Sequence, residues 1–285
     1  MTTADLIQRA RRRASDLPLS QIVEWMARVG YGARGFVYLS VGLLTLLAAM
    51  DQVGSAVGSS GAAGWLAGQP LGRVWLILLG VGLWLFVLWR VLQAVFDADN
   101  EGADLKGWAM RAGQAMSGVF YALLASTVFE YLDEYGPRPA AEDVAENQEK
   151  ASVLMALPFG EWLIVLAGLV ILAVGVGNIL RAWKDRFTEE LKCSEDLCRV
   201  VRPMARLGYA ARGFAYLPLA IFVILAGFNS DVSEVTSFGE ALDALEARPG
   251  GSLVLATTAI GLMAFGVFAF VEACWRRIRP PKELT

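Results

Sequence analysis

A few ionisable side chains recur at fixed spacing inside otherwise apolar segments. Arg34 and Arg212 each precede a tyrosine by four residues, Tyr38 and Tyr216, so each pair shares one face of a helix. Such a pair could bind an anionic lipid headgroup or an anionic solute. It could also anchor a helix at the membrane interface, with arginine reaching phosphates and tyrosine in the aromatic belt. We expect anchoring. Because Ser117 stands at the matching position of a third, related segment, any site built here would be asymmetric.

A second set of polar residues lies near the ends of three other apolar segments: Gln93, Arg181 and Glu272. Glu272 follows a long charge-free run and has basic neighbours. It could pair with Arg34, Arg206 or Arg212 across a bundle of helices. We expect a structural ion pair rather than a proton-relay carboxylate, because these positions lie near helix ends, where a charge costs less than at the bilayer centre.

Side chains for most catalytic and metal chemistry are missing. The chain has no His, which removes His-ligated haem, His-containing zinc sites and His acid–base chemistry. Its three cysteines are Cys193, Cys198 and Cys274. The first two, without further ligands, make a poor metal site, and we expect reduced thiols. The apolar segments offer no nucleophile–base pair either, so we predict a protein that is not an enzyme and holds no cofactor or metal.

The elements that carry these residues are long apolar segments. Of the 285 residues, 56% are hydrophobic and 19% are charged, whereas soluble domains carry about a quarter charged residues. A helix needs roughly 17–25 apolar residues to cross a bilayer. Six blocks nearly free of charge meet or approach that length: 35–50, 74–96, 112–129, 160–180, 213–230 and 250–271. We predict an all-α integral membrane bundle of six transmembrane helices, the first of them an uncleaved span.

Lys and Arg are distributed unevenly between the loops that such spans would leave. Of the 25 Lys and Arg residues in the chain, four would face one side: Arg73, Arg138, Lys150 and Arg248. All the others fall on the opposite side. The positive-inside rule therefore predicts a multi-pass protein of the plasma (inner) membrane with both termini cytoplasmic. The partners we expect are the lipid bilayer and its anionic headgroups at the cytoplasmic face, and we expect no nucleic acid.

Two motifs recur three times in the same order. The first, Arg-x-Gly-x4-Gly-x2-Tyr, begins at Arg28, Arg111 and Arg206. It ends at Tyr38, Tyr121 and Tyr216, near the start of each odd-numbered span. The second, Leu-x3-Pro-x-Gly, precedes each even-numbered span. We predict three parallel two-helix repeats, 24–97, 107–187 and 202–279, between a basic segment 1–23 and a tail 280–285. A pseudo-threefold axis along the membrane normal is the natural packing, although a non-symmetric bundle fits the same sequence.

These motifs resemble the bacterial family called domain of unknown function 1206. The resemblance rests on both motifs and on the sequence Leu-Trp-Arg-x2-Gln-Ala that ends at Ala94, and it covers about 24–279. It implies a six-helix membrane protein with three tandem copies of a two-helix domain, and it implies no activity. The middle copy departs from the pattern, with Gln114 in place of Tyr and Ser117 in place of the second Arg.

The segments between the spans suggest simpler roles. Two short amphipathic stretches, 19–29 and 197–207, indicate interfacial helices that lead into odd spans. The acidic segment 133–150 is typical of a mobile surface loop, and the Gly/Ser-rich run 54–64 of a flexible linker.

Three functions from different classes fit these observations. The first is a non-catalytic scaffold that binds partners through its basic cytoplasmic loops. The second is a conduit for a small solute or an ion along the pseudo-threefold axis, and the third is a membrane enzyme. A conduit requires polar residues through the bundle, whereas the centres of the six blocks are Gly, Leu, Val and Ala. We therefore expect the scaffold and keep the conduit as the alternative.

Overall fold

The computed structural model describes residues 19–52, 55–133, 140–184, 190–247 and 249–278. The tail 280–285 and most of the basic segment 1–23 lie outside these residues. Six long helices meet the length and hydropathy needed to cross a membrane. They are α2 (Leu19–Ala49), α4 (Gly72–Phe96), α5 (Leu105–Asp133), α7 (Gly160–Lys184), α8 (Glu195–Asn229) and α10 (Gly251–Trp275). The described residues contain no strand beyond one isolated bridge, so the all-α, six-span prediction is confirmed.

Each repeat contains a short helix that the sequence did not suggest. The three are α3 (Ser59–Ala67), α6 (Ala140–Met155) and α9 (Phe238–Glu246). Two predictions for the connecting segments are therefore wrong. The run 54–64 is helical from Ser59, and the acidic segment 133–150 is helical up to Asp133 and again from Ala140, with 134–139 outside the described residues. The Gly/Ser content of the first segment and the acidic content of the second suggested loops, although both contain several alanines, which favour a helix.

The Leu-x3-Pro-x-Gly motif forms the turn between each short helix and the long helix that follows it. The residue between Pro and Gly is left-handed in all three copies, at Leu71, Phe159 and Gly250. The next residue begins the long helix, and a Cβ added there would lie 2.2 Å from a backbone carbonyl oxygen of the short helix at Gly72, Gly160 and Gly251. Only glycine fits so close an approach, which explains why the motif ends on it.

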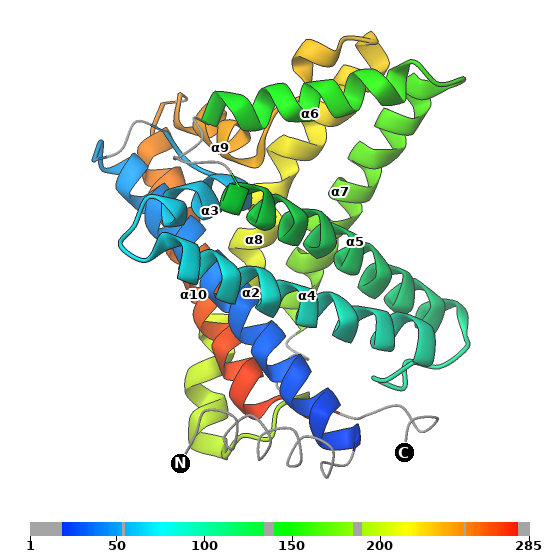
Figure 1. Cartoon of the computed structure of the whole chain (residues 1–285), viewed down its shortest axis with the longest axis vertical. Coiled ribbons are helices and arrows are strands. Elements are labelled where there is room, and N and C mark those ends of the chain that lie inside the picture. The colour runs from blue at the N-terminus through cyan, green and yellow to red at the C-terminus, as the bar shows by residue number, and fades with distance from the viewer. Residues whose placement is uncertain (1–18, 53–54, 134–139, 185–189, 248, 279–285) are drawn as a thin grey trace, which may run out of the picture.

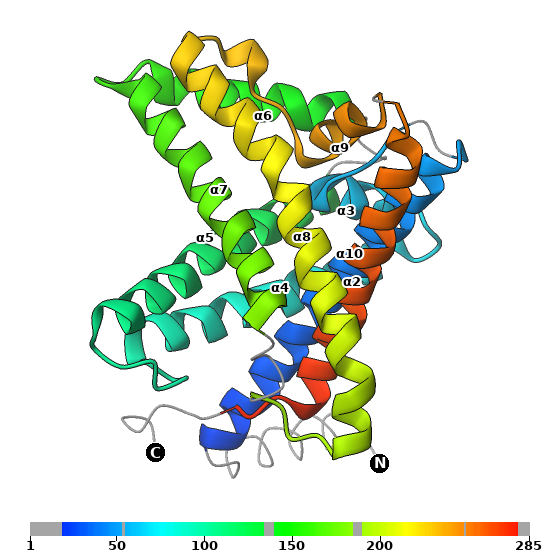
Figure 2. The same cartoon turned by 180° about the vertical axis from the view of Figure 1, so that it is seen from behind.

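The segments 19–29 and 197–207 are not separate interfacial helices, and that prediction is wrong. Each is continuous with the span that follows it, so α2 has 31 residues and α8 has 35. The first helix continues without a break through Arg28, Val29 and Gly30, where the interfacial segment was expected to end. Pro203 and Pro218 are both accommodated inside α8. These helices therefore continue past the ends of their neighbours at one end of the bundle (Figures 1 and 2).

The long helices pair in a cyclic order. The even helix of each repeat packs on the odd helix of the next, α4 on α5 and α7 on α8, and α10 closes the cycle by packing on α2. Within the outer repeats α2 also contacts α4, and α8 contacts α10. The middle repeat differs, because α5 and α7 diverge and give the molecule an X-shaped outline (Figures 1 and 2). The parallel repeats are thus present, but the two long helices of the second repeat do not pack on each other as those of the first and third do.

Glycines set how closely the paired helices approach. A Cβ on Gly35 of α2 would lie 2.9 Å from the carbonyl oxygen of Gly266 on α10, and one on Gly266 would lie 2.8 Å from that of Gly35. Gly175 and Gly213 repeat this contact between α7 and α8, at 3.1 and 2.6 Å. Small residues at helix crossings allow this approach in lipid, where van der Waals packing drives association.

The glycines also show where the packing of the middle repeat differs from that of the other two. In the outer repeats Gly30 and Gly208 face the backbone of Phe86 and Phe265, at 2.6 and 2.7 Å from an added Cβ. The equivalent Gly113 has no atom within 4 Å of an added Cβ. The close contact that holds odd and even helices together within the outer repeats is therefore absent within the middle one.

The short helices gather at the end of the bundle opposite the projecting starts of α2 and α8, where α6 contacts both α3 and α9. The segment before α3 meets α9 through Asp243, whose Oδ1 accepts a hydrogen bond of 2.7 Å from the backbone N–H of Ala56. Burial raises the pKa of Asp243, repulsion from Glu240 adds to this, and the hydrogen bond from Ala56 opposes it. The net effect is a carboxyl group that holds its proton to a higher pH in the folded protein.

Asp243→Asn should remove a pH dependence of stability. A raised carboxyl pKa contributes stability that is fully present below the unfolded value of about 3.8 and is lost as the pH rises through the folded value. Asparagine keeps an acceptor for Ala56 and does not ionise. Thermal unfolding from pH 3.5 to 7 should therefore show the wild type losing stability relative to Asp243→Asn as the pH rises above about 4. Parallel curves for the two proteins would contradict the assignment.

Candidate functional site

Two arginines of the repeated motif bind the ends of neighbouring helices. Arg28 of α2 donates from Nη1 to the carbonyl oxygens of Ala273 and Cys274 at the end of α10, at 2.7 and 2.6 Å. Arg111 of α5 donates to the equivalent carbonyls at the end of α4, those of Ala94 and Val95, both at 2.8 Å. A cation there satisfies carbonyls that lack an intrahelical partner and complements the helix dipole. We call this end of the bundle the basic end.

The third arginine of the same column, Arg206 of α8, does not follow this pattern. It is exposed, and no equivalent contact with the end of α7 is present in the described part of the chain. Arg181, near the end of α7, is exposed as well. These two candidates therefore lie on the surface of the basic end.

Arg34 and Glu272 form a buried ion pair between α2 and α10. Their side chains are 4% and 2% exposed. Of the three arginines considered as partners for Glu272, Arg34 is the one that contacts it. The other oxygen of Glu272 accepts a hydrogen bond of 2.8 Å from Arg276, which directly follows α10. One carboxylate thus binds two guanidinium groups.

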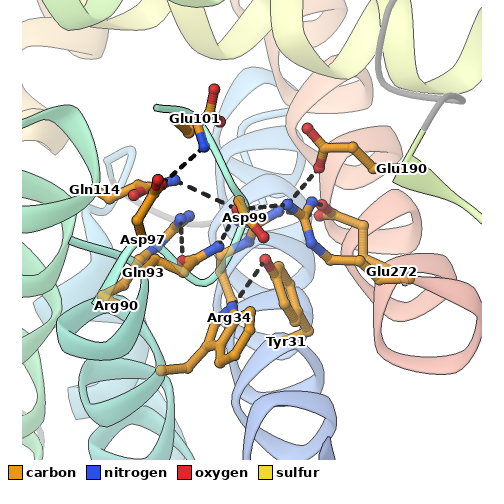
Figure 3. A network of polar contacts seen from close by, with 12 residues as sticks. Tyr31, Arg34, Arg90, Gln93, Asp97, Asp99, Glu101, Gln114, Glu190 and Glu272 are labelled. Carbon is orange, nitrogen blue, oxygen red and sulfur yellow. Dashed lines mark hydrogen bonds and ion pairs between the residues drawn. The ribbon is translucent and has the colours of Figure 1, made fainter. Parts of the chain in front are cut away.

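The network continues into the first repeat through Asp99, in the loop after α4. Its Oδ2 lies 3.3 Å from Arg276 and accepts a hydrogen bond of 2.5 Å from the buried Gln93. Gln93 in turn accepts a hydrogen bond of 2.8 Å from Arg90. Gln114 of α5 donates to the same oxygen of Asp99 at 3.3 Å. Residues from all three repeats therefore meet at the basic end (Figure 3).

The loop between α7 and α8 closes over this network. Glu190 forms an ion pair with Arg276, and Leu191 forms an isolated antiparallel bridge with Arg276. Backbone hydrogen bonds run from Lys192 to Trp275 and from Arg277 to Glu190, at 2.7 and 2.8 Å. The loop therefore pairs with the residues that follow α10.

The prediction that the cysteines are reduced thiols is wrong for two of them. Cys193 and Cys198 form a disulfide, with Cα atoms 5.7 Å apart, within the usual range. Ser194 lies between them as the N-cap of α8, so the first helical turn brings the two side chains together. Cys274 is free and exposed.

Arginine and phenylalanine side chains alternate deeper in the bundle. Along this arginine–aromatic stack, the guanidinium carbon of Arg90 lies 4.7 Å from the ring centre of Phe86, and that of Arg34 lies 5.5 Å from the same ring. Arg34 also lies 5.0 Å from the ring centre of Phe265, and Arg212 lies 4.8 Å from it. Phe86 and Phe265 occupy the same position in the first and third repeats.

Within the described residues, two cations of the stack have only neutral hydrogen-bond partners. The polar partner of Arg90 is Gln93, and that of Arg212 is the hydroxyl of Tyr216. An aromatic ring face contributes on the order of 2 kcal/mol to a desolvated cation. Removing an ion from water costs several kcal/mol. The aromatic contacts alone therefore do not offset the free energy needed to remove Arg90 and Arg212 from water.

The three tyrosines of the repeated motif come together beside these cations. The hydroxyl groups of Tyr38 and Tyr216 lie 3.3 Å apart, and Arg212 lies 5.0 Å from the ring centre of Tyr38. Tyr121, from the middle repeat, packs edge-on against Phe86 with ring centres 4.8 Å apart. It is close enough to interact electrostatically with Arg34 and Arg212.

Sequence reasoning missed most partners in the network. The missed residues are Arg90, Asp99, Gln114, Glu190 and Arg276. A signal existed for Arg276, since it follows Glu272 by four residues and so lies on the same helix face. None existed for Asp99 and Glu190, because each lies in a polar loop with several other acids. Burial and the repulsion from Asp99 and Glu190 raise the pKa of Glu101 in the same loop as Asp99.

The fold and this network define a multi-pass helical membrane protein made of three tandem repeats. The chain matches the family described as Domain of Unknown Function (DUF1206) at residues 29–97, 112–185 and 207–276. These segments cover most of the sequence, so the protein belongs to this family, as its motifs predicted. It is similar to "Uncharacterized protein YxxB" of Bacillus subtilis (strain 168), with 27% identity over 259 residues, 90% of this chain and 92% of the relative. No solved structure matches the chain.

Proposed function

We propose that this protein is a non-catalytic scaffold of the plasma membrane that binds anionic lipid headgroups at its basic end. We propose that this end faces the cytoplasm, where the Cys193–Cys198 disulfide would be reduced. The observation that carries this proposal is the buried network, which joins residues of all three repeats at that end. A surface whose supporting side chains are held from several helices is suited to binding rather than to a moving gate.

The surface over the network is rich in cations. Arg199 and Arg206 are exposed on the projecting part of α8, seven residues apart and therefore on one face of the helix. Lys192 and Arg277 are exposed nearby in the paired loop segments. Basic residues beside a membrane span attract anionic headgroups by about 1 kcal/mol each.

The alternative, a conduit through the bundle, has less support. Among the described residues, the fully buried charged side chains are Arg34, Glu272 and Arg276, all toward the basic end. Farther along the same helices the buried polar residues are threonines, Thr45 and Thr258. These features favour a closed bundle over a polar path.

The proposal is tested by the lipids that the protein retains. Protein extracted from liposomes of equal phosphatidylglycerol and phosphatidylcholine should co-purify with an excess of phosphatidylglycerol, quantified by mass spectrometry. Arg199→Glu combined with Arg206→Glu should abolish most of the excess. Lys150→Glu at the opposite end is the matched control, because its pairing with Glu146 is an exposed contact of small energy. Equal retention of the two lipids by the wild type would overturn lipid binding.

Flux measurements separate the scaffold from the conduit. Proteoliposomes loaded with an ion or small-solute reporter should leak no faster than empty liposomes across a broad panel. Flux of any reporter through the wild-type protein above that of empty liposomes would instead favour the conduit.

A further inference from the structure

Cations exceed anions around the arginine–aromatic stack. Arg34 and Arg276 share Glu272, and Arg276 also contacts Asp99 and Glu190. Arg90 and Arg212, at the two ends of the stack, have no carboxylate partner among the described residues. Both are half-buried, so each remains accessible to a ligand while being largely removed from water.

The environment of Arg212 also contains hydrogen-bond donors that are not used. Its Nε is buried without a partner in the described part of the chain, and so is the hydroxyl of Tyr121. Tyr38 and Tyr216 share one hydrogen bond between their hydroxyl groups, so the proton of one of them remains to be donated. Arg212 Nε, the hydroxyl of Tyr121 and one hydroxyl of the Tyr38–Tyr216 pair are therefore three unused donors in this part of the bundle. Buried donors of this kind are normally satisfied.

We propose that Arg212, together with Tyr38, Tyr216 and Tyr121, binds a phosphate-type oxyanion within the bundle. A guanidinium group presents its N–H groups in a fixed fork that matches the oxygens of phosphate. Tyrosine hydroxyls can donate to the remaining oxygens. The bound anion would balance the charge of Arg212 and use the donors that the protein leaves free. This site lies inside the bundle and does not depend on the exposed cations of the proposed scaffold surface.

Thermal unfolding tests the site directly. Delipidated protein in a non-ionic detergent is titrated with sodium phosphate or sulfate, and with sodium chloride at matched ionic strength. A ligand that binds the folded state raises the midpoint in a saturable way, so phosphate should raise the Tm of the wild type by several degrees beyond chloride. Arg212→Gln should lose this rise. Arg206→Gln is the matched control, because it removes an exposed arginine of the same helix, and it should keep the rise.

The phosphate could be free or part of a lipid headgroup, and a second titration separates these sources. If the natural ligand is a headgroup, short-chain phosphatidic acid should raise the Tm while inorganic phosphate does not. Phosphatidylcholine of the same chain length controls for the acyl chains. Either source should lose its effect in Arg212→Gln, because both use the same phosphate chemistry.

Tyr121→Phe tests the site without altering any charge. It removes one unused donor and keeps the ring against Phe86, so the concentration of phosphate needed for half of the Tm shift should rise about three- to tenfold. This variant also decides the matter if Arg212→Gln does not fold. An equal response to phosphate and chloride, no response to any phosphate compound, or an unchanged response in Tyr121→Phe would overturn the proposal.

Discussion

Glu272→Gln is expected to destabilise the bundle by about 3–5 kcal/mol, because removing one partner of a buried ion pair leaves the other charge uncompensated. Arg34 has no other carboxylate partner among the described residues, and it is 3% exposed. Glutamine keeps the shape of the side chain, so the loss reports charge and not packing. For a chain of this size the change corresponds to a fall of the order of 10 °C in Tm.

A double variant separates the cost of leaving Arg34 unpaired from the net contribution of the ion pair. Arg34→Met with Glu272→Met removes both charges and keeps apolar volume, and it should recover much of the stability, since buried pairs replaced by hydrophobic residues are often neutral. Arg276 would still contact Asp99 and Glu190. A Tm of Glu272→Gln within about 2 °C of the wild type would show that the pair contributes little.

Gly266→Ala is expected to destabilise the bundle by forcing α2 and α10 apart. The added Cβ would lie 2.7 Å from the backbone nitrogen of Leu39 and 2.8 Å from the carbonyl oxygen of Gly35. Both are backbone atoms, which cannot rotate away, so α2 and α10 must separate. Overpacking of this kind costs about 1–3 kcal/mol, and Gly266→Leu should cost more. Thermal unfolding in one detergent measures both variants.

Gly177→Ala in α7 is the matched control, because nothing lies within 4 Å of the added Cβ. It should be neutral or stabilising by up to about 1 kcal/mol, since alanine favours the helix. Equal losses in Gly266→Ala and Gly177→Ala would mean that helix approach does not determine the effect. Gly213→Ala should resemble Gly266→Ala, because its added Cβ would lie 2.6 Å from the carbonyl oxygen of Gly175.

The spans and the repeats could be predicted because their physical causes are local. A charge-free block long enough to cross a bilayer has few alternatives, and the two motifs recur at the same place in each repeat. The short helices could not be predicted in this way. The residues of α3 are mostly Gly, Ala and Ser, which give a weak helical signal. Those of α6 include many Ala and Glu, which favour a helix, but their acidic composition suggested a surface loop instead.

The site was only partly predictable. Arg34, Glu272, Arg212 and the motif tyrosines stood out because each is polar within an apolar segment. Their partners Asp99 and Glu190 come from loops whose path depends on the whole fold. The sequence did hold a signal for the two rings that flank Arg34, because Phe86 and Phe265 occupy equivalent positions in the first and third repeats. It could have been found by aligning the even helices for aromatic residues as well as for polar ones.

The contact between α10 and α2 closes the cycle with the same arginine–carbonyl bonds that join α4 to α5. A single repeat, present as three separate chains, would form such a cycle as a homotrimer, and every copy would then have to be identical. Joining the copies in one polypeptide removes that requirement. The middle copy has Ser117 where the others have arginine, and Val174 where they have phenylalanine. Because the three repeats are joined in one chain, the second repeat can differ in sequence from the first and the third.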